Sequence, residues 1–132
     1  MDGSGGAADA ASYQYADGPV VVDLAAQTAT GQGIDTLSNI ESGVGSKFAD
    51  TLIGSSQDDF LYGLGGRDTL TGGPGDDVLD GGAHADLILG EEGADLLAGG
   101  AGDDTLNGGS GADAASWQFS PTPVVADLTA GS

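Results

Sequence analysis

Apolar residues recur every nine positions over more than half of the chain. From Gly45 onward the sequence divides into eight consecutive nonapeptides without an insertion, and each begins with glycine. The eighth position is apolar throughout, occupied by Leu52, Leu61, Leu70, Leu79, Ile88, Leu97, Leu106 and Ala115. No stretch shows the 3.6-residue apolar period of a capped helix. The pattern predicts an all-β protein of stacked repeats.

Each nonapeptide joins a glycine-rich half to a short half with one inward apolar side chain. Glycine permits tight turns with positive φ, and so short a strand buries apolar surface only by stacking. Two nonapeptides then make an 18-residue coil of turn, strand, turn and strand. We therefore expect a parallel β-roll, that is, a β-solenoid with two nonapeptides per coil and a thin leucine core.

The flanks are less regular. Residues 20–24 predict a strand by their β-branched content, and residues 30–38 are interpreted as one more imperfect nonapeptide, with an acidic linker as the alternative. We expect an irregular β segment at 1–44, the roll at 45–116, and the start of a further unit at 117–132. Tyr13, Tyr15, Trp117 and Phe119 are expected to cover the ends of the roll.

A longer repeat frames the nonapeptides. The sequence ADAASY at residues 8–13 returns as ADAASW at residues 112–117, which is 104 residues later (112 − 8). VVVDL at residues 20–24 returns as VVADL at residues 124–128 with the same offset. The chain is therefore interpreted as one unit of a tandem array, whose neighbouring units are expected partners.

The charge adds a requirement for a cation. Asp and Glu number 21 against two Lys and Arg, for a net charge of −19. Such a charge destabilises a compact body and is typical of disorder, yet 39% of the residues are apolar. A divalent metal reconciles the two, whereas nucleic acid and an anionic membrane surface have the wrong sign. The absence of Cys excludes disulfides and thiolate metal sites. A bound metal is the alternative way to stabilise so small a domain.

The spacing of the acids points to calcium. The sixth position is aspartate in all eight repeats, at Asp50, Asp59, Asp68, Asp77, Asp86, Asp95, Asp104 and Asp113. Alternate turns stack on opposite edges of a roll, at the strand spacing of about 4.7–4.9 Å. An ion between two stacked carboxylates then lies near the Ca²⁺–oxygen distance of about 2.3–2.6 Å. Mg²⁺ and Zn²⁺ suit this oxygen ladder less well.

Without an ion the stacked carboxylates repel each other. The cost is about 1 kcal/mol per pair in water and about 3–4 kcal/mol at an effective dielectric constant of 20. Several such pairs rival the stability of an ordinary domain, about 5–15 kcal/mol. We therefore expect the calcium-free chain to be largely unfolded, so that calcium binding also drives folding.

Two repeats, GGPGDDVLD at residues 72–80 and GGAGDDTLN at residues 99–107, resemble the RTX (repeats-in-toxin) nonapeptide. The resemblance covers residues 45–116 and implies a right-handed parallel β-roll that binds several calcium ions, about five to seven. It also implies an extracellular protein exported by type I secretion. The N-terminus lacks the features of a secretory signal, which fits that route or an excised segment.

In the family, each ion lies between turns 18 residues apart. The earlier turn gives the carbonyls of its second and fourth positions, the later turn gives those of its first and third, and each gives its aspartate. Carried over, the resemblance implies carbonyl ligands at Ser55, Gln57, Gly63, Leu64, Gly65, Gly66, Gly72, Gly73, Pro74, Gly75, Gly81, Gly82, Ala83, His84, Gly90, Glu91, Glu92, Gly93, Gly99, Ala101, Gly108 and Ser110. A further pair would join Ser46 and Phe48 to the third turn.

Several turns depart from the glycine pattern. Ser46, Phe48, Ser55 and Gln57 replace glycine in the first two turns, which we expect to bind most weakly. The side chain of His84 is expected in solvent, as are Asp58, Asp76 and Asp103, which precede ligand aspartates. Glu41 could close an additional calcium site with the turn at Gly54.

The sequence favours a non-enzymatic, monomeric, calcium-binding module without membrane insertion. A Ser-His-Asp triad would need the lone His84, and no phosphate-binding loop occurs. Two alternatives remain open: an adhesion or polysaccharide-binding module, which tandem units favour, and the C-terminal tail of a secreted hydrolase.

Overall fold

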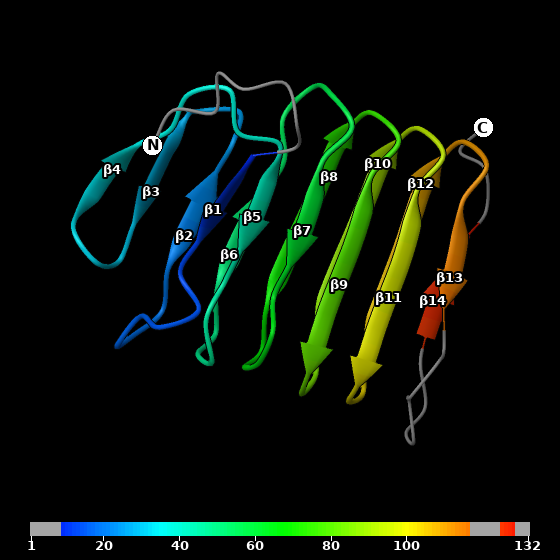
Figure 1. Ribbon diagram of the computed structural model, residues 1–132. Coiled ribbons are helices and arrows are strands. Elements are labelled where there is room, and N and C mark those ends of the chain that lie inside the picture. Colours follow the sequence, from blue (N-terminus) through cyan, green and yellow to red (C-terminus); the bar gives the residue numbers. More distant parts are fainter. Residues whose placement is uncertain (1–8, 117–124, 129–132) are drawn as a thin grey trace.

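The fold is a parallel β-roll made of two sheets (Figure 1). Apolar side chains from both sheets form the core between them. The structure is a computed structural model that describes residues 9–116 and 125–128. The first sheet has the order β1 (Ala10–Ser12), β5 (Ser42–Val44), β7 (Phe60–Tyr62), β9 (Val78–Ala83), β11 (Leu96–Ala101) and β13 (Ala114–Ser116). The second has the order β14 (Val125–Asp127), β12 (Thr105–Ser110), β10 (Leu87–Glu92), β8 (Thr69–Pro74), β6 (Thr51–Ile53), β2 (Val21–Asp23), β3 (Thr28–Thr30) and β4 (Ile34–Thr36).

The strand register confirms two nonapeptides per coil. Phe60 pairs with Val78 and Val78 with Leu96, all in parallel strands and each one coil of 18 residues apart. The second sheet repeats this offset, since Thr51 pairs with Thr69. Odd-numbered and even-numbered turns therefore stack on opposite edges of the roll, as the sequence predicts.

The eighth-position side chains fill the core. Those from Leu52 to Leu106 are at most 1% exposed, and Ala115 is partly buried at the end of the row. Strand alternation separates them from their neighbours: in β11, Leu97 is fully buried whereas Leu96 is 44% exposed. Each coil thus contributes only two large apolar side chains, so the core is thin.

The N-terminal segment differs from the prediction in one respect. The strand expected at residues 20–24 is present as β2, but the interpretation of residues 30–38 as a nonapeptide is wrong. They belong to an antiparallel hairpin in which β3 pairs with β2 and β4 pairs with β3. Gly31 and Gly33, with φ of 120° and 115°, permit the sharp reversal between the two strands. This hairpin extends the second sheet beyond β2 (Figure 1).

The aromatic residues behave differently from one another. Tyr13 packs into the core at 8% exposure, and its hydroxyl donates a hydrogen bond to Asp35 Oδ2 at 2.7 Å. Tyr15 is 89% exposed, so the expectation that it covers an end of the roll is wrong. Trp117 and Phe119 lie outside the described residues. In the part of the chain that the structure describes, no helix has the length and hydropathy of a membrane span.

Candidate metal centre

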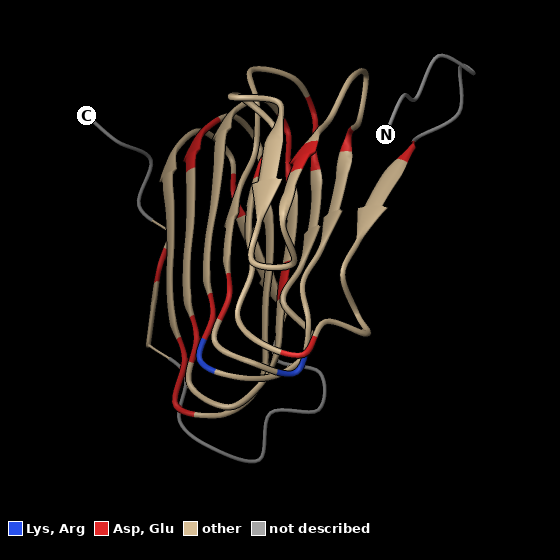
Figure 2. Cartoon of the chain, turned by 90° about the vertical axis from the view of Figure 1, so that its left-hand side faces the viewer, with Lys and Arg blue, Asp and Glu red and all other residues tan. Residues whose placement is uncertain are grey.

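Two columns of aspartates line the turn edges of the roll (Figure 2). In each column the backbone amide of one aspartate donates to Oδ1 of the aspartate one coil later. On one edge these bonds run from Asp50 to Asp68, from Asp68 to Asp86 and from Asp86 to Asp104, at 2.7, 2.8 and 3.0 Å. On the other they run from Asp59 to Asp77, from Asp77 to Asp95 and from Asp95 to Asp113, at 2.8, 2.9 and 3.0 Å. The ladder fixes the position of each carboxylate.

The second oxygen of most of these carboxylates has no partner. Oδ2 is buried, without a hydrogen bond to any residue that the structure describes, in Asp68, Asp77, Asp86, Asp95, Asp104 and Asp113. A buried carboxylate oxygen that lacks a hydrogen bond or a counter-ion costs several kcal/mol, about 2–7 even for a neutral polar group. The described side chains therefore form rows of oxygens that suit a hard cation.

The turns of repeats three to eight share a backbone conformation that exposes carbonyl groups. Their second and fourth positions all have positive φ: Leu64, Gly66, Gly73, Gly75, Gly82, His84, Glu91, Gly93, Gly100, Gly102, Gly109 and Gly111. Leu64, His84 and Glu91 adopt it although left-handed φ is uncommon for residues other than glycine. Residues with side chains at these three positions thus adopt the same turn conformation as the glycines of the other repeats.

Stacked glycines leave room where carbonyl and carboxylate oxygens meet. A Cβ added to Gly72 would contact Asp77 Oδ2 and would lie 2.9 Å from the carbonyl oxygen of Gly90, in the next turn of the column. A Cβ on Gly73 would lie 2.6 Å from the carbonyl oxygen of Ser55, in the preceding turn. The oxygens that converge are thus aspartates and turn carbonyls. Among the described residues no three His, Asp or Glu side chains form a metal-ligand cluster of their own.

The structure stacks the turns that the sequence paired. Gly73 lies beside Glu91, and Glu91 beside Gly109, on one edge; Gly65 lies beside Ala83, and Ala83 beside Ala101, on the other. All predicted ligand residues lie within the described chain. They provide two aspartates and turn carbonyls at each step, so the donor set fits calcium. The residues of turns three to eight would hold the ions.

The first two turns differ from the later turns in the hydrogen bonds to their aspartates. The amides of Ser46 and Ser55 each donate to Oδ2 of the aspartate in their own turn, Asp50 and Asp59, at 2.5 Å. Neither serine has positive φ, and neither does Phe48 or Gln57 at the fourth position. In these turns a backbone amide stabilises the carboxylate oxygen that is left without a partner in the later turns. The expectation that calcium binds most weakly in these two turns stays a prediction.

Burial raises the pKa of the column aspartates. It raises the pKa of Asp68 to about 6, and the pKa of Asp77 and of Asp86 to about 7; the charges of aspartates in adjacent coils add to the effect. The pKa of Asp59 and of Asp95 is raised for the same main reason. Protons and cations therefore compete for these groups.

The residues beside the columns are exposed, as predicted, but two of them are also ordered by hydrogen bonds. Asp58 Oδ1 accepts from the amide of Asp76 at 2.9 Å, and Asp76 Oδ1 accepts from the amide of Ala94 at 2.9 Å. The sequence analysis missed this outer ladder, for which the signal is aspartate at the fifth position of consecutive turns on one edge. His84 is exposed, with Nδ1 2.8 Å from the carbonyl oxygen of Ala83.

Sequence comparison agrees with this geometry. Residues 44–79, 63–97 and 80–114 match the family described as RTX calcium-binding nonapeptide repeat (4 copies). Together these matches span residues 44–114, more than half of the chain. The chain belongs to the RTX calcium-binding repeat family, whose repeats bind calcium. No match was found among curated proteins.

Replacing Asp77 by Asn should raise the calcium concentration needed for half-maximal folding at least tenfold, about 1.4 kcal/mol. The D77N side chain can still accept the Asp59 amide, but it loses the charge of a buried ligand. Without calcium the same variant should be more stable than wild type, because a buried charge is removed. The matched control is D76N, next to it and exposed, which should change the midpoint less than about threefold. Equal calcium midpoints of folding for D77N and D76N would contradict the assignment of the column aspartates as calcium ligands.

The stability of the calcium-free chain should fall as the pH rises from about 4 to 8. Folded-state pKa values raised to about 6–7 favour folding while the carboxyls are protonated, and this contribution is lost as the pH passes through those values. Calcium affinity should change in the opposite direction, because the ion replaces protons. Urea denaturation in metal-free buffer over this pH range measures the first trend. A calcium-free stability that increases with pH would refute the assignment.

Proposed function

We propose that this chain is a calcium-induced folding and stabilisation module of an extracellular protein exported by type I secretion. The observation that carries the proposal is the set of six buried Oδ2 atoms without partners. These atoms leave the metal-free roll with uncompensated negative charge in its two turn edges. Calcium neutralises that charge and bridges consecutive coils, so its binding free energy contributes to folding.

The turn conformations support a graded set of sites. Four pairs of stacked turns have positive φ at both second and fourth positions and an Oδ2 without a partner in both aspartates. They are the pairs of Asp68 with Asp86, Asp77 with Asp95, Asp86 with Asp104 and Asp95 with Asp113. Two further pairs include the serine-closed first turns, and Lys47 and Arg67 lie in the turns of one of them. We propose tight binding in the four complete pairs and weaker binding in the other two.

The compartment follows from the calcium requirement. A chain that is unfolded at the low calcium concentration of the cytosol can pass through a secretion channel and then fold where calcium is abundant. Membership of the RTX family supports this route, since its proteins are typically exported by type I secretion.

We propose a non-catalytic role for this segment. Its carboxylates form regular columns with the spacing of the coils, which suits repeated ion sites better than a single acid–base pair. The repeat over 104 residues also favours an adhesion or polysaccharide-binding array as a second candidate function. Binding of the calcium-loaded chain to a glycan array would distinguish this candidate from a purely structural module.

Titration of the full chain with calcium should produce a cooperative increase in β-structure by far-UV circular dichroism. Magnesium at the same concentrations should produce little change, because it prefers six ligands in a regular octahedron and retains its water. A chain that is already folded in excess chelator at neutral pH would overturn the proposal. The roll would then be an ordinary solenoid whose turns only happen to bind calcium.

A further inference from the structure

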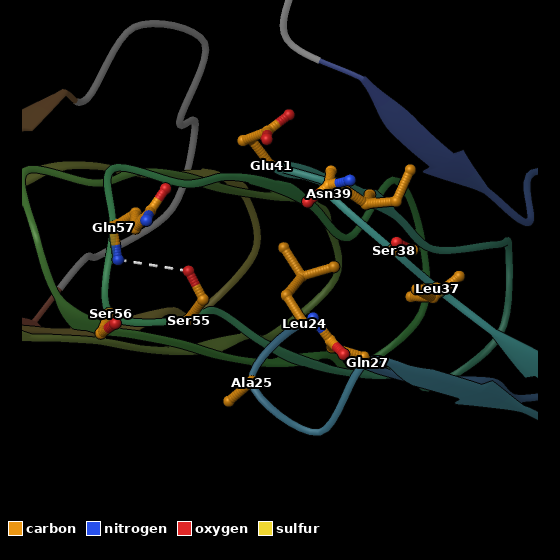
Figure 3. Close-up of a pocket in the computed structure, with 11 residues that line it drawn as sticks. Leu24, Ala25, Gln27, Leu37, Ser38, Asn39, Glu41, Ser55, Ser56 and Gln57 are labelled. Carbon is orange, nitrogen blue, oxygen red and sulfur yellow. Dashed lines mark hydrogen bonds between the residues drawn. The ribbon is translucent and has the colours of Figure 1, made fainter. Parts of the chain in front are cut away.

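A pocket of about 390 Å³ separates the first nonapeptide turns from the segment before them (Figure 3). Asn39 and Glu41 lie on one side of it, and Ser55, Ser56 and Gln57 of the second turn lie on the other. Leu24 and Leu37 form its apolar floor. The pocket therefore lies between two consecutive turns of one edge, where the later turns of the same edge stack directly.

Glu41 occupies the place of a column aspartate in the coil before Asp59. Ser42 pairs with Phe60, and the amide of Phe60 donates to the carbonyl oxygen of Glu41 at 2.9 Å, so Glu41 and Asp59 are neighbours across adjacent strands. The amide of Asp9 donates to Glu41 Oε2 at 3.1 Å, which repeats the amide–carboxylate bond of the ladder. The column thus extends one coil beyond the nonapeptides.

The ladder is interrupted at this step. The amide of Glu41 donates to the carbonyl oxygen of Asp9 at 3.2 Å and is turned away from Asp59. Asp59 is 1% exposed, and its Oδ1, the atom that accepts an amide of the preceding coil in the later members of the column, is buried without a partner. The charge of Glu41 adds to burial in raising the pKa of Asp59. The buried Oδ1 of Asp59 therefore lacks a partner among the described residues, and Glu41 adds a second negative charge from the adjacent strand.

We propose that a divalent cation, calcium in the first instance, binds between Glu41 and Asp59. Oxygens of Asn39, Ser55 and Gln57 at the pocket wall complete its surroundings. Asn39, two residues before Glu41, has φ of 52°, as the fourth position of a complete turn would. This site begins before the matched repeats and uses a glutamate. It rests on the proposed calcium binding of the chain and adds an ion that ties the N-terminal segment to the roll.

The test counts bound ions by native mass spectrometry on the full chain. Glu41→Gln should bind one calcium fewer than wild type, because it keeps an acceptor for the Asp9 amide but loses the charge. Asp17→Asn, an exposed position outside both columns, is the charge-matched control and should keep the wild-type count. Equal counts for wild type and E41Q would overturn this site alone, and a proton shared by the two carboxyls would then explain the pair. A wild-type chain that binds no calcium would overturn the proposed function as well.

A second measurement guards against a variant that fails to fold. Crystals of the wild-type chain grown with terbium should show an anomalous peak between Glu41 and Asp59. Peaks confined to the stacked turns of repeats three to eight would overturn the site while leaving the proposed function intact.

A different observation concerns the ends of the roll. β13 and β14 repeat β1 and β2 at the 104-residue offset (114 − 10 and 125 − 21), and they extend the same two sheets at the opposite end. In a tandem array, β13 and β14 of one unit are therefore β1 and β2 of the next. The first sheet accommodates this directly: among the described strands β1 pairs with β5 alone, and its outer edge can receive the preceding β11.

The second sheet cannot pair with a preceding unit in the same way. β2 pairs with β6 on one edge and with β3 on the other, whereas its equivalent β14 pairs with β12. In a tandem array, β6, β3 and the β12 of the preceding unit would then compete for the two edges of β2. The hairpin is the weakly held competitor, because it buries Ala29 but leaves Ile34 82% exposed. We infer that the β3–β4 hairpin is a removable cap, which covers β2 in a first unit and yields to β12 of a preceding unit.

A two-unit chain, residues 1–112 followed by residues 9–132, tests this inference. Gln32→Asn at the exposed hairpin tip of the second unit makes its peptides distinguishable by mass. In calcium, the β3 amides of the second unit should exchange hydrogen at least tenfold faster than those of the first unit, which serves as the internal control. Equal protection in both units would show that the hairpin stays in place and that the roll is interrupted at each junction.

Discussion

The fold depends on rows of carboxylates held inside a roll at the spacing of neighbouring strands. Seven column aspartates are at most 3% exposed, and each is fixed by an amide of an adjacent coil or of its own turn. Fixed carboxylates cannot move apart to relieve their repulsion. Every other feature of the roll, from its glycine turns to its thin leucine core, is compatible with this arrangement only if a cation or a proton compensates the charge.

The roll has two kinds of turn, which differ in whether a protein group bonds Oδ2 of the turn's aspartate. In the first two turns, serine amides bond Oδ2 of Asp50 and of Asp59, so these two oxygens have partners without metal, whereas Oδ1 of Asp59 has none among the described residues. From the third turn onward, the second and fourth positions have positive φ, and Oδ2 has no partner among the described residues. The first coil can therefore serve as a template on which successive coils assemble as calcium binds.

The nonapeptide period was sufficient to predict the coil length, the core row and the two aspartate columns. A fixed spacing of Gly, Asp and Leu allows only one stacking register in which all leucines are buried. The N-terminal segment could not be predicted in the same way, because Gly31 and Gly33 suit a hairpin as well as a repeat turn. The bond from each aspartate amide to the next Oδ1 was also missed, since it depends on the rotamer and not on the spacing. From Asp68 onward, that bond explains why Oδ1 of each column aspartate is occupied while Oδ2 is available.

Small-angle X-ray scattering tests the coupling of calcium to folding most directly, because it reports the size of the whole chain. For 132 residues the radius of gyration should be about 37 Å when unfolded and roughly 14 Å when folded. At neutral pH the account predicts the larger value in chelator and the smaller value in millimolar calcium. A compact chain in chelator would show that the columns tolerate their charge without an ion, and the central claim would be wrong.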